Sequence, residues 1–343
     1  MAEWLCSGLQ LRVHRFDSVL SLHKMKILIT GSSGFIGYHL VKRLLKDGHN
    51  IIGVDNHNDY YDVKLKRLRT TLLNSANFKF YLQNINHLDI EDEGIDLAIN
   101  LAAQAGVRVK KEREHLYMHS NIKGFEAFCN FCEKKGINKI IYASSSSVYS
   151  DNHTKKFTED LTRLEPKSLY GFSKLANEQY ANRLCKQKNL SIVGLRFFSV
   201  YGPYGRPDMA YFLFTEAIKN KKQILLNNKG IMSRDMTYID DIIDGIEGAI
   251  TYIIENSKIQ NEIFNLGNDY PISTIDLLKS IETKLSSKTV IKETKSSNEA
   301  LITHADNTKS KNLLGYDPKV SFEDGINFFL DWHKHYTNIQ KLK

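Results

Sequence analysis

The chain has 343 residues, of which 42% are hydrophobic and 25% are charged, so it can bury a full core in one or two domains. Its formal net charge of +8 favours anionic partners, but no nucleic-acid recognition motif accompanies the dispersed basic residues. No stretch approaches the roughly 18 uninterrupted apolar residues of a transmembrane helix. We therefore expect a globular protein with a small anionic ligand, no nucleic-acid partner and no membrane insertion.

The first 24 residues differ from the rest, and we expect at 1–24 either a poorly ordered extension or an upstream start whose true initiator is Met25. Glu3, Arg12 and Asp17 interrupt any apolar segment there, which argues against a secretory signal. After Met25, short apolar strands alternate with helices. We expect strands at 26–30, 50–54, 78–82, 97–101, 138–143 and 191–197, and helices at 34–47, 64–73 and 168–187. This alternation predicts an α/β fold with a doubly wound parallel sheet of the Rossmann type.

The pattern changes near residue 200. Residues 201–207 contain two glycines and two prolines, which predict a loop. Short helices at 211–219, 239–254 and 274–285 follow, mixed with short strands at 223–226 and 262–266. We therefore expect a smaller C-terminal mixed α/β domain formed by 201–233 and 266–343, while 234–265 returns to the Rossmann domain at 25–200.

Cysteines and histidines predict neither a disulfide framework nor a metal site. The chain has four cysteines, too few to staple a fold of this size, and this number fits a reducing, cytoplasmic location. Cys129 and Cys132 share one face of an expected helix, where buried apolar packing is the simpler interpretation. His115 and His119 lack a third ligand, so we expect no metal.

A glycine motif follows the first strand and opens the first helix. Gly31, Gly34 and Gly37 have the G-x-x-G-x-x-G spacing that permits a tight turn, a close approach to a pyrophosphate and close packing of the helix. The free N–H groups at the helix start would face the phosphates. Asp55 ends the second strand, where a carboxylate can bind ribose hydroxyls and repels a 2′-phosphate. The motif therefore predicts NAD, and not NADP, as the cofactor.

A tyrosine and a lysine one helical turn apart form the second motif. At pH 7 a free tyrosine is only about 0.1% phenolate, so a tyrosine base needs its anion stabilised. Lys174 lies on the same helix face as Tyr170 and supplies a positive charge. A hydroxyl from the serine cluster 144–147 can donate to the substrate oxygen or relay its proton. Together with the glycine motif, these residues indicate hydride transfer at a hydroxylated carbon.

Beyond these motifs, the sequence resembles the extended short-chain dehydrogenase/reductase superfamily and, within it, the NAD-dependent nucleotide-sugar epimerases, most of all the UDP-glucuronate 4-epimerases. The similarity runs from about residue 25 to residue 336 and rests on the segments 55–62, 101–108, 120–121, 143–149, 195–203, 205–209 and 234–241. Two departures are Ser150, where a glycine is common, and Asn84, where an aspartate near the adenine is usual. Asparagine can still hydrogen-bond adenine, so the NAD assignment stands.

The resemblance implies a role for each matching residue. The catalytic residues are Tyr170, Lys174 and Ser145. The cofactor-binding residues are Gly31, Gly34, Phe35, Ile36, Gly37, Asp55, Asn84, Ala102, Ala103 and Lys174. The substrate-binding residues are Arg108, Ser146, Ser147, Ser199, Arg206 and Arg234. The Rossmann domain would then bind NAD and the C-terminal domain the nucleotide sugar, in a homodimer formed through the helices at 121–134 and 168–187.

The activity implied by the resemblance is 4-epimerisation of a UDP-sugar through a 4-keto intermediate, with UDP-glucuronate converted to UDP-galacturonate for polysaccharide biosynthesis. Arginine forks suit the carboxylate and diphosphate of such a substrate. UDP-glucose and UDP-N-acetylglucosamine are alternative substrates, because neutral and acidic sugars share the catalytic residues. A dehydratase needs an acid beside the catalytic serine, where Ser146 and Ser147 stand here. A non-catalytic NAD-binding protein would not need Tyr170 and Lys174 together.

Overall fold

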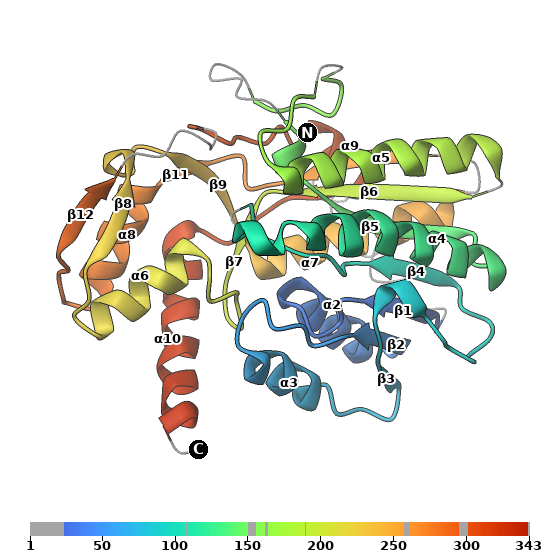
Figure 1. The fold of residues 1–343 in the computed structure, drawn as a ribbon, viewed down its shortest axis with the longest axis horizontal. Coiled ribbons are helices and arrows are strands. Elements are labelled where there is room, and N and C mark those ends of the chain that lie inside the picture. Colours follow the sequence, from blue (N-terminus) through green and yellow to red (C-terminus); the bar gives the residue numbers. More distant parts are fainter. Residues whose placement is uncertain are drawn as a thin grey trace, which may run out of the picture.

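A computed structural model describes residues 24–107, 109–149, 156–161, 164–188, 190–256, 261–294 and 301–341. Except for Lys24, the expected extension lies outside these residues. A seven-stranded sheet forms the centre of the described chain, in the order β10-β6-β5-β4-β1-β2-β3 (Figure 1). Its strands are β1 (Lys26–Thr30), β2 (Asn50–Asp55), β3 (Phe78–Leu82), β4 (Leu97–Asn100), β5 (Lys139–Ser145), β6 (Ser191–Phe197) and β10 (Asn261–Leu266). All neighbouring strands pair in parallel, so the predicted doubly wound sheet is confirmed.

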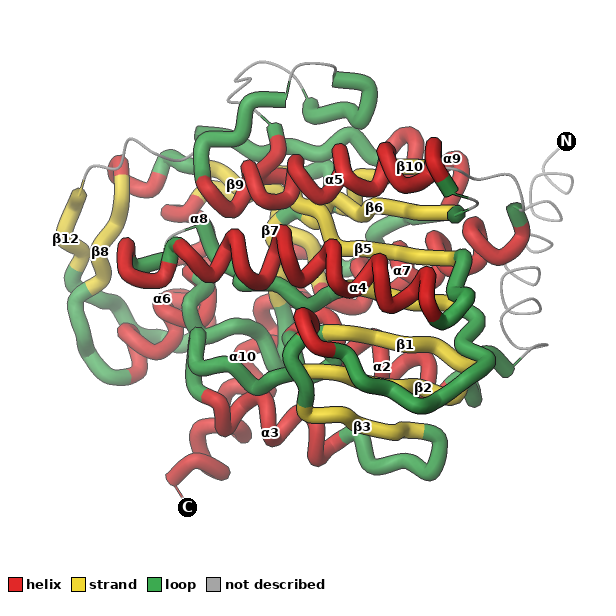
Figure 2. Tube along the Cα trace, turned by 45° about the vertical axis from the view of Figure 1, so that its right-hand side comes forward, coloured by secondary structure: helices red, strands yellow, loops and turns green. Residues whose placement is uncertain are grey.

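Helices cover both faces of this sheet. The helices α2 (Phe35–Lys46) and α7 (Ile239–Glu255) pack on one face, and α4 (Gly124–Lys134) and α5 (Leu169–Gln187) run side by side over the other (Figure 2). Successive side chains of a strand point to opposite faces of the sheet, so they pack against different helices. Ile27 and Ile29 join the core beneath α2 and α7, whereas Leu28 joins the core beneath α4 and α5. No helix within the described residues has the length and apolarity to cross a bilayer.

The second lobe of the molecule lies beyond the carboxyl ends of these strands (Figure 1). It holds a three-stranded sheet, β11-β9-β7, and a two-stranded sheet, β12-β8. The strands are β7 (Ser199–Tyr201), β8 (Ile224–Asn227), β9 (Ser233–Tyr238), β11 (Pro271–Ser273) and β12 (Ile291–Thr294), and the remaining helices of this half of the chain are α6 (Ala210–Lys219), α8 (Thr274–Lys284), α9 (Thr308–Leu314) and α10 (Phe322–Lys341). Within 234–265, α7 and β10 lie on the main sheet, while β9 pairs with β7 and β11. The division into an NAD-binding and a sugar-binding domain stays a prediction.

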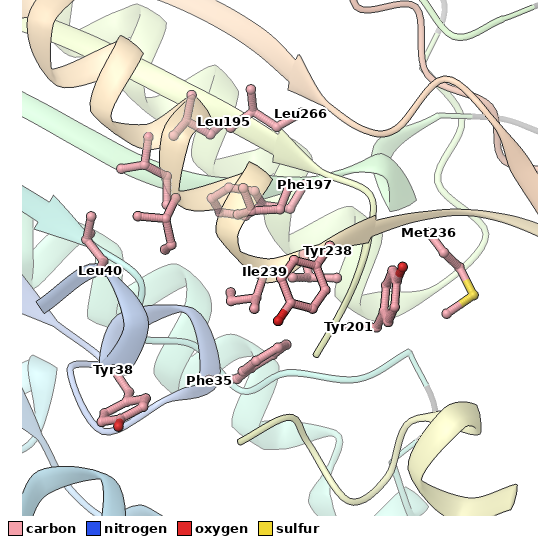
Figure 3. Packing of buried hydrophobic residues seen from close by; sticks show 14 of the residues in the cluster. Phe35, Tyr38, Leu40, Leu195, Phe197, Tyr201, Met236, Tyr238, Ile239 and Leu266 are labelled. Atoms are coloured by element: carbon pink, nitrogen blue, oxygen red, sulfur yellow. The ribbon is translucent and has the colours of Figure 1, made fainter. Parts of the chain in front are cut away.

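One hydrophobic core connects the two lobes. Figure 3 shows Leu40 of α2 and Leu195 of β6 in the same buried cluster as Tyr201 of β7 and Met236 of β9. Packed interiors deform little, so a shared core holds the lobes in a fixed relation. The segments that connect the two lobes are therefore held in a fixed position beside the ends of the strands of the main sheet.

The helix that carries Tyr170 begins at a capping serine. The side chain of Ser168 accepts a hydrogen bond from the Gly171 backbone N–H at 3.0 Å, which satisfies one of the free donors at the helix start. A Cβ added at Gly171 would lie 2.3 Å from the Ser147 carbonyl oxygen. The first turn of α5 therefore packs directly on the serine turn that follows β5, and this contact brings Tyr170 close to Ser145.

Candidate active site

A cavity of about 660 Å³ opens where the strands of the main sheet end. Segments after β1, β2, β4, β5 and β6 line it, which is the usual ligand position in an open parallel sheet. Parts of α6, β8 and β9 line the opposite side from the second lobe. Because the cavity runs from the glycine turn to the second lobe, it has room for a cofactor beside a second ligand.

The glycine turn after β1 has the geometry that a pyrophosphate needs. Gly31 has a φ of +76°, a backbone conformation that glycine adopts without strain. A Cβ added at Gly37 would lie 2.1 Å from the Gly31 carbonyl oxygen, so α2 can start this close only with glycine. Gly34 caps α2 without a side-chain hydrogen bond, and no acidic residue lies in the first turn. The helix N-terminus is therefore open to an anion, and Gly31, Gly34, Phe35, Ile36 and Gly37 all line the cavity.

Replacing Gly37 with alanine is expected to lower NAD affinity at least about tenfold, since the new methyl must displace the Gly31 carbonyl from the turn. Isothermal titration of the stripped protein with NAD measures this loss. Lys46→Ala, at the exposed far end of the same helix, is the control and should bind NAD like the parent protein. Equal NAD affinity in Gly37→Ala and the control would contradict the role of the close approach.

The other predicted cofactor residues are divided between the cavity and its surroundings. The Asp55 carboxylate lines the cavity and accepts hydrogen bonds from the backbone N–H groups of His57 (2.8 Å) and Ser33 (3.2 Å), which fix its orientation. Ala102 and Ala103 line the cavity from the loop after β4. Asn84 does not: its side-chain oxygen accepts from the Asn86 backbone N–H at 3.0 Å, and its neighbours Gln83 and Ile85 line the cavity instead.

Tyr170, Lys174 and Ser145 lie together at the cavity wall. The Lys174 ammonium donates to the Ala143 carbonyl at 2.8 Å and lies 5.8 Å from the centre of the Tyr170 ring. The Ser145 hydroxyl is hydrogen-bonded to Tyr170 and also accepts from the Ser147 backbone N–H at 3.1 Å. The spatial cluster expected from the sequence is therefore present, with each member held by a backbone group or by a neighbour.

Burial works against charge at both titratable members of this cluster. Burial lowers the pKa of Lys174 to about 8, and nearby Glu178 opposes this effect, so the ammonium form still predominates at pH 7. Burial also raises the pKa of the Tyr170 phenol, while Arg206 and the hydrogen bond with Ser145 lower it by less. Tyr170 and Lys174 are therefore both protonated at pH 7.

Five of the six predicted substrate residues lie at the cavity: Ser146, Ser147, Ser199, Arg206 and Arg234. The sixth, Arg108, is outside the described residues. Sequence reasoning missed an apolar wall from the second lobe formed by Leu213, Leu225, Leu226 and Met232. Leu213 is 52% exposed and Leu225 is 62% exposed, and only their position at the cavity separates them from ordinary surface leucines. No local pattern in the sequence marks them.

A buried asparagine that received no role connects two walls of the cavity. The Asn121 side chain accepts from the Gln104 backbone N–H at 2.7 Å and donates to the Ser173 hydroxyl at 2.9 Å, and that hydroxyl donates to the Tyr170 carbonyl at 2.7 Å. It lies in η3 (Tyr117–Lys123), a π-helical turn that precedes α4. Such turns occur often at functional sites. Asn121 thus fixes the loop after β4 against the start of α5.

Taken together, the parallel sheet, the open glycine turn and the tyrosine–lysine–serine cluster define a class of dinucleotide-dependent enzymes that act at a hydroxylated carbon. The chain belongs to the NAD dependent epimerase/dehydratase family, whose family model matches residues 27–267. The superfamily membership predicted from the sequence is therefore confirmed.

Relatives within this family include sugar epimerases. The chain is 36% identical to UDP-glucuronate 4-epimerase 2 of Arabidopsis thaliana, over 97% of this chain and 81% of the plant protein. It is 34% identical to a Bacillus cereus UDP-glucuronic acid 4-epimerase solved with UDP-glucuronic acid and NAD, with a TM-score of 0.84 over 91% of this chain and 100% of that one. A Thermotoga maritima UDP-glucose 4-epimerase solved with UDP-glucose is 27% identical, with a TM-score of 0.78 over 91% of this chain and 100% of that one.

Proposed function

We propose that this protein is an enzyme, an NAD-dependent 4-epimerase that converts UDP-glucuronate to UDP-galacturonate through a 4-keto sugar. The observation that carries the proposal is one cavity that holds Tyr170, Lys174 and Ser145 beside the Arg206 guanidinium. The first three residues suit proton transfer at a hydroxyl, and the guanidinium suits a carboxylate. The similarity to the plant and Bacillus proteins, which are UDP-glucuronate epimerases by name, supports the same substrate.

NAD fits the glycine turn and Asp55. The open N-terminus of α2 would hold the pyrophosphate, and the oriented Asp55 carboxylate would accept from ribose hydroxyls and would repel a 2′-phosphate. Bound oxidised NAD would supply the hydride acceptor for sugar carbon 4, the return of that hydride to the opposite face of the same carbon, and a positive charge near Tyr170. All other steps of the reaction are proton transfers and binding contacts of this chain.

Tyr170 removes the proton from the sugar 4-hydroxyl and, after the 4-keto sugar has turned over in the cavity, returns a proton to the 4-oxygen of the inverted sugar. Lys174, held at the Ala143 carbonyl, stabilises the phenolate through space, and the Ser145 hydroxyl donates to the sugar oxygen. Ser146 and Ser147 stand where an eliminating enzyme would place an acid. Hydroxyls of this kind do not protonate a leaving group near pH 7, so the cluster favours inversion over elimination.

The remaining predicted residues bind the two anionic parts of the substrate. Arg206 and Ser199 line the cavity and suit the sugar with its carboxylate, and Arg234 on β9 suits the diphosphate. The apolar wall of the second lobe, Leu213, Leu225, Leu226 and Met232, offers a surface for the base. This arrangement suits a sugar that lies between the nucleotide and the tyrosine.

The test is incubation of the NAD-loaded protein with UDP-glucuronate, UDP-glucose and UDP-N-acetylglucosamine, with the products resolved by NMR. We expect UDP-galacturonate from the first and at least about tenfold lower kcat/KM with the neutral sugars, since these lose a charge-assisted contact to Arg206. Inversion of a neutral sugar alone would establish the alternative, a UDP-glucose or UDP-N-acetylglucosamine epimerase.

We further propose a homodimer formed through α4 and α5. On α5, Leu169 is 51% exposed and Phe172 is 55% exposed, and their spacing of three residues puts them on one helix face. Light scattering after size exclusion should show a dimer that Phe172→Glu separates into monomers. A cytoplasmic location fits Cys129, Cys132 and Cys185, which are free and buried. A place in polysaccharide biosynthesis stays a prediction.

A further inference from the structure

Arg206 is held by an acidic residue two positions further along the chain. Its Nε donates to one Asp208 carboxylate oxygen at 3.1 Å, and its Nη2 donates to the other at 2.6 Å. This two-point contact fixes the plane of the guanidinium. Asp208 occupies the Nε and Nη2 edge of the guanidinium. A second carboxylate in the cavity that Arg206 lines would therefore approach the guanidinium from its Nη1 side.

Asp208 is held in turn by a tyrosine from the cofactor side of the molecule. The Tyr60 hydroxyl donates to the Asp208 oxygen that also receives Arg206 Nη2, at 3.0 Å. Tyr60 lies five residues after Asp55, in the loop between β2 and α3 (Val63–Leu72), and its ring lies 5.7 Å from the Arg206 guanidinium carbon. Asp208, Tyr60 and Arg206 all line the cavity.

A glycine in a third loop makes room for the Tyr60 hydroxyl. A Cβ added at Gly106 would lie 2.0 Å from that hydroxyl oxygen and 3.6 Å from Arg206 Nη2. The Gly106 carbonyl accepts from the Tyr117 hydroxyl at 2.5 Å, which holds the loop after β4 in place. The loops after β2, β4 and β7 therefore meet at Tyr60, directly beside the guanidinium.

The protonation states support this arrangement. Burial would raise the pKa of Asp208, but the Arg206 guanidinium and the hydrogen bonds outweigh it, so the pKa is lowered and the carboxylate stays ionised. Burial and the Asp208 charge raise the pKa of Tyr60 to about 12, so its hydroxyl remains a donor. The contact chain Tyr60–Asp208–Arg206 is thus intact across the neutral pH range.

We propose that Asp208, anchored by Tyr60, is a positioning residue that fixes the Arg206 fork to receive the substrate carboxylate and so determines specificity for an acidic sugar. The inference rests on the proposed function. The opposite possibility is that Asp208 competes with the substrate for the same guanidinium. The two differ in sign: losing a positioning residue weakens uronate binding, whereas losing a competitor strengthens it.

The experiment compares Asp208→Asn and Tyr60→Phe with matched controls remote from the cavity, Asp317→Asn and Tyr252→Phe. Steady-state kinetics give KM and kcat for UDP-glucuronate. Titration calorimetry, with Tyr170→Phe added to stop turnover, gives the affinities for UDP-glucuronate and for UDP. We expect KM to rise about tenfold in Asp208→Asn and about threefold in Tyr60→Phe, with kcat within about twofold. UDP lacks the sugar, so its affinity should not change.

Three results would overturn the proposal. A lower KM in Asp208→Asn would identify Asp208 as a competitor, unchanged KM in both variants would remove its role, and an equal loss of UDP affinity would indicate general damage to the site. Thermal unfolding shows whether each variant folds. If Asp208→Asn does not fold, Tyr60→Phe still tests the proposal, because it keeps the Asp208–Arg206 charge pair. A parent protein that inverts only neutral sugars contradicts the proposed function itself and is recognised before any variant is measured.

Discussion

Replacing Tyr170 with phenylalanine is expected to lower kcat for 4-epimerisation about a thousandfold, while NAD and UDP-glucuronate still bind. Tyr170 is the proposed proton acceptor of this cluster, because the Lys174 ammonium, which predominates at pH 7, would stabilise its phenolate together with the positive charge of the bound oxidised nicotinamide. The phenylalanine ring keeps the packing of the first turn of α5. Steady-state kinetics measure the loss of turnover, and absorbance of the released cofactor measures bound NAD.

Tyr180→Phe, on the same helix but away from the cavity, is the control and should retain parent turnover. The turnover of this control shows whether loss of a tyrosine hydroxyl from α5 is enough to lower activity, apart from any chemical role of Tyr170. A Tyr170→Phe protein that keeps more than about a tenth of the parent kcat would exclude the tyrosine as the proton acceptor. Activity lost together with bound NAD would instead indicate a damaged cofactor site.

The sheet could be predicted from the sequence because its signals are local. Apolar runs such as 26–30 alternate with helical periods, and the glycine spacing marks the turn after the first strand. The start of α5 could also be predicted, because Ser168, Tyr170 and Lys174 lie close together in the chain. Residues that act within a few positions of each other leave a pattern in the chain.

Contacts between distant segments leave no such pattern. Tyr60 and Asp208 are 148 positions apart, and both lie in segments that supported the resemblance without being assigned a role. The resemblance assigns Asn84 to the adenine, but in the structure its side-chain oxygen accepts from the Asn86 backbone N–H in the following turn. Asparagine favours such local contacts with the backbone, and sequence position alone does not reveal this choice.

A buried ion pair close to Lys174, between Glu178 and Arg196, also has no signal in the sequence. Glu178 follows Lys174 by one helical turn, and its partner Arg196 lies on β6. The two side chains are 8% and 4% exposed, and two hydrogen bonds join them, at 2.9 Å and 2.7 Å. The Ser144 hydroxyl donates to the same carboxylate at 2.5 Å. Burial of opposite charges 18 positions apart is visible only once the sheet has formed.

Glu178→Gln is therefore expected to destabilise the fold by about 3–5 kcal/mol, because it leaves the Arg196 charge buried without its counter-charge. Urea unfolding followed by circular dichroism measures the change. Glu133→Gln is the control: its pair with Lys188 is exposed, so its loss should change stability by less than about 1 kcal/mol. Equal urea midpoints of unfolding for the two variants would show that the buried ion pair contributes no more to stability than the exposed one.

The same substitution should also shift the pH dependence of turnover. Glu178 raises the pKa of Lys174 against the effect of burial, so its loss moves that pKa further below about 8. Lys174 then loses its proton, and the phenolate its stabilising charge, at a lower pH than in the parent protein. The alkaline limb of the kcat profile should move to lower pH in Glu178→Gln and stay in place in Glu133→Gln. If Glu178→Gln is less stable but its alkaline limb does not move, Glu178 only stabilises the packing of β6 against α5 and does not affect the pKa of Lys174.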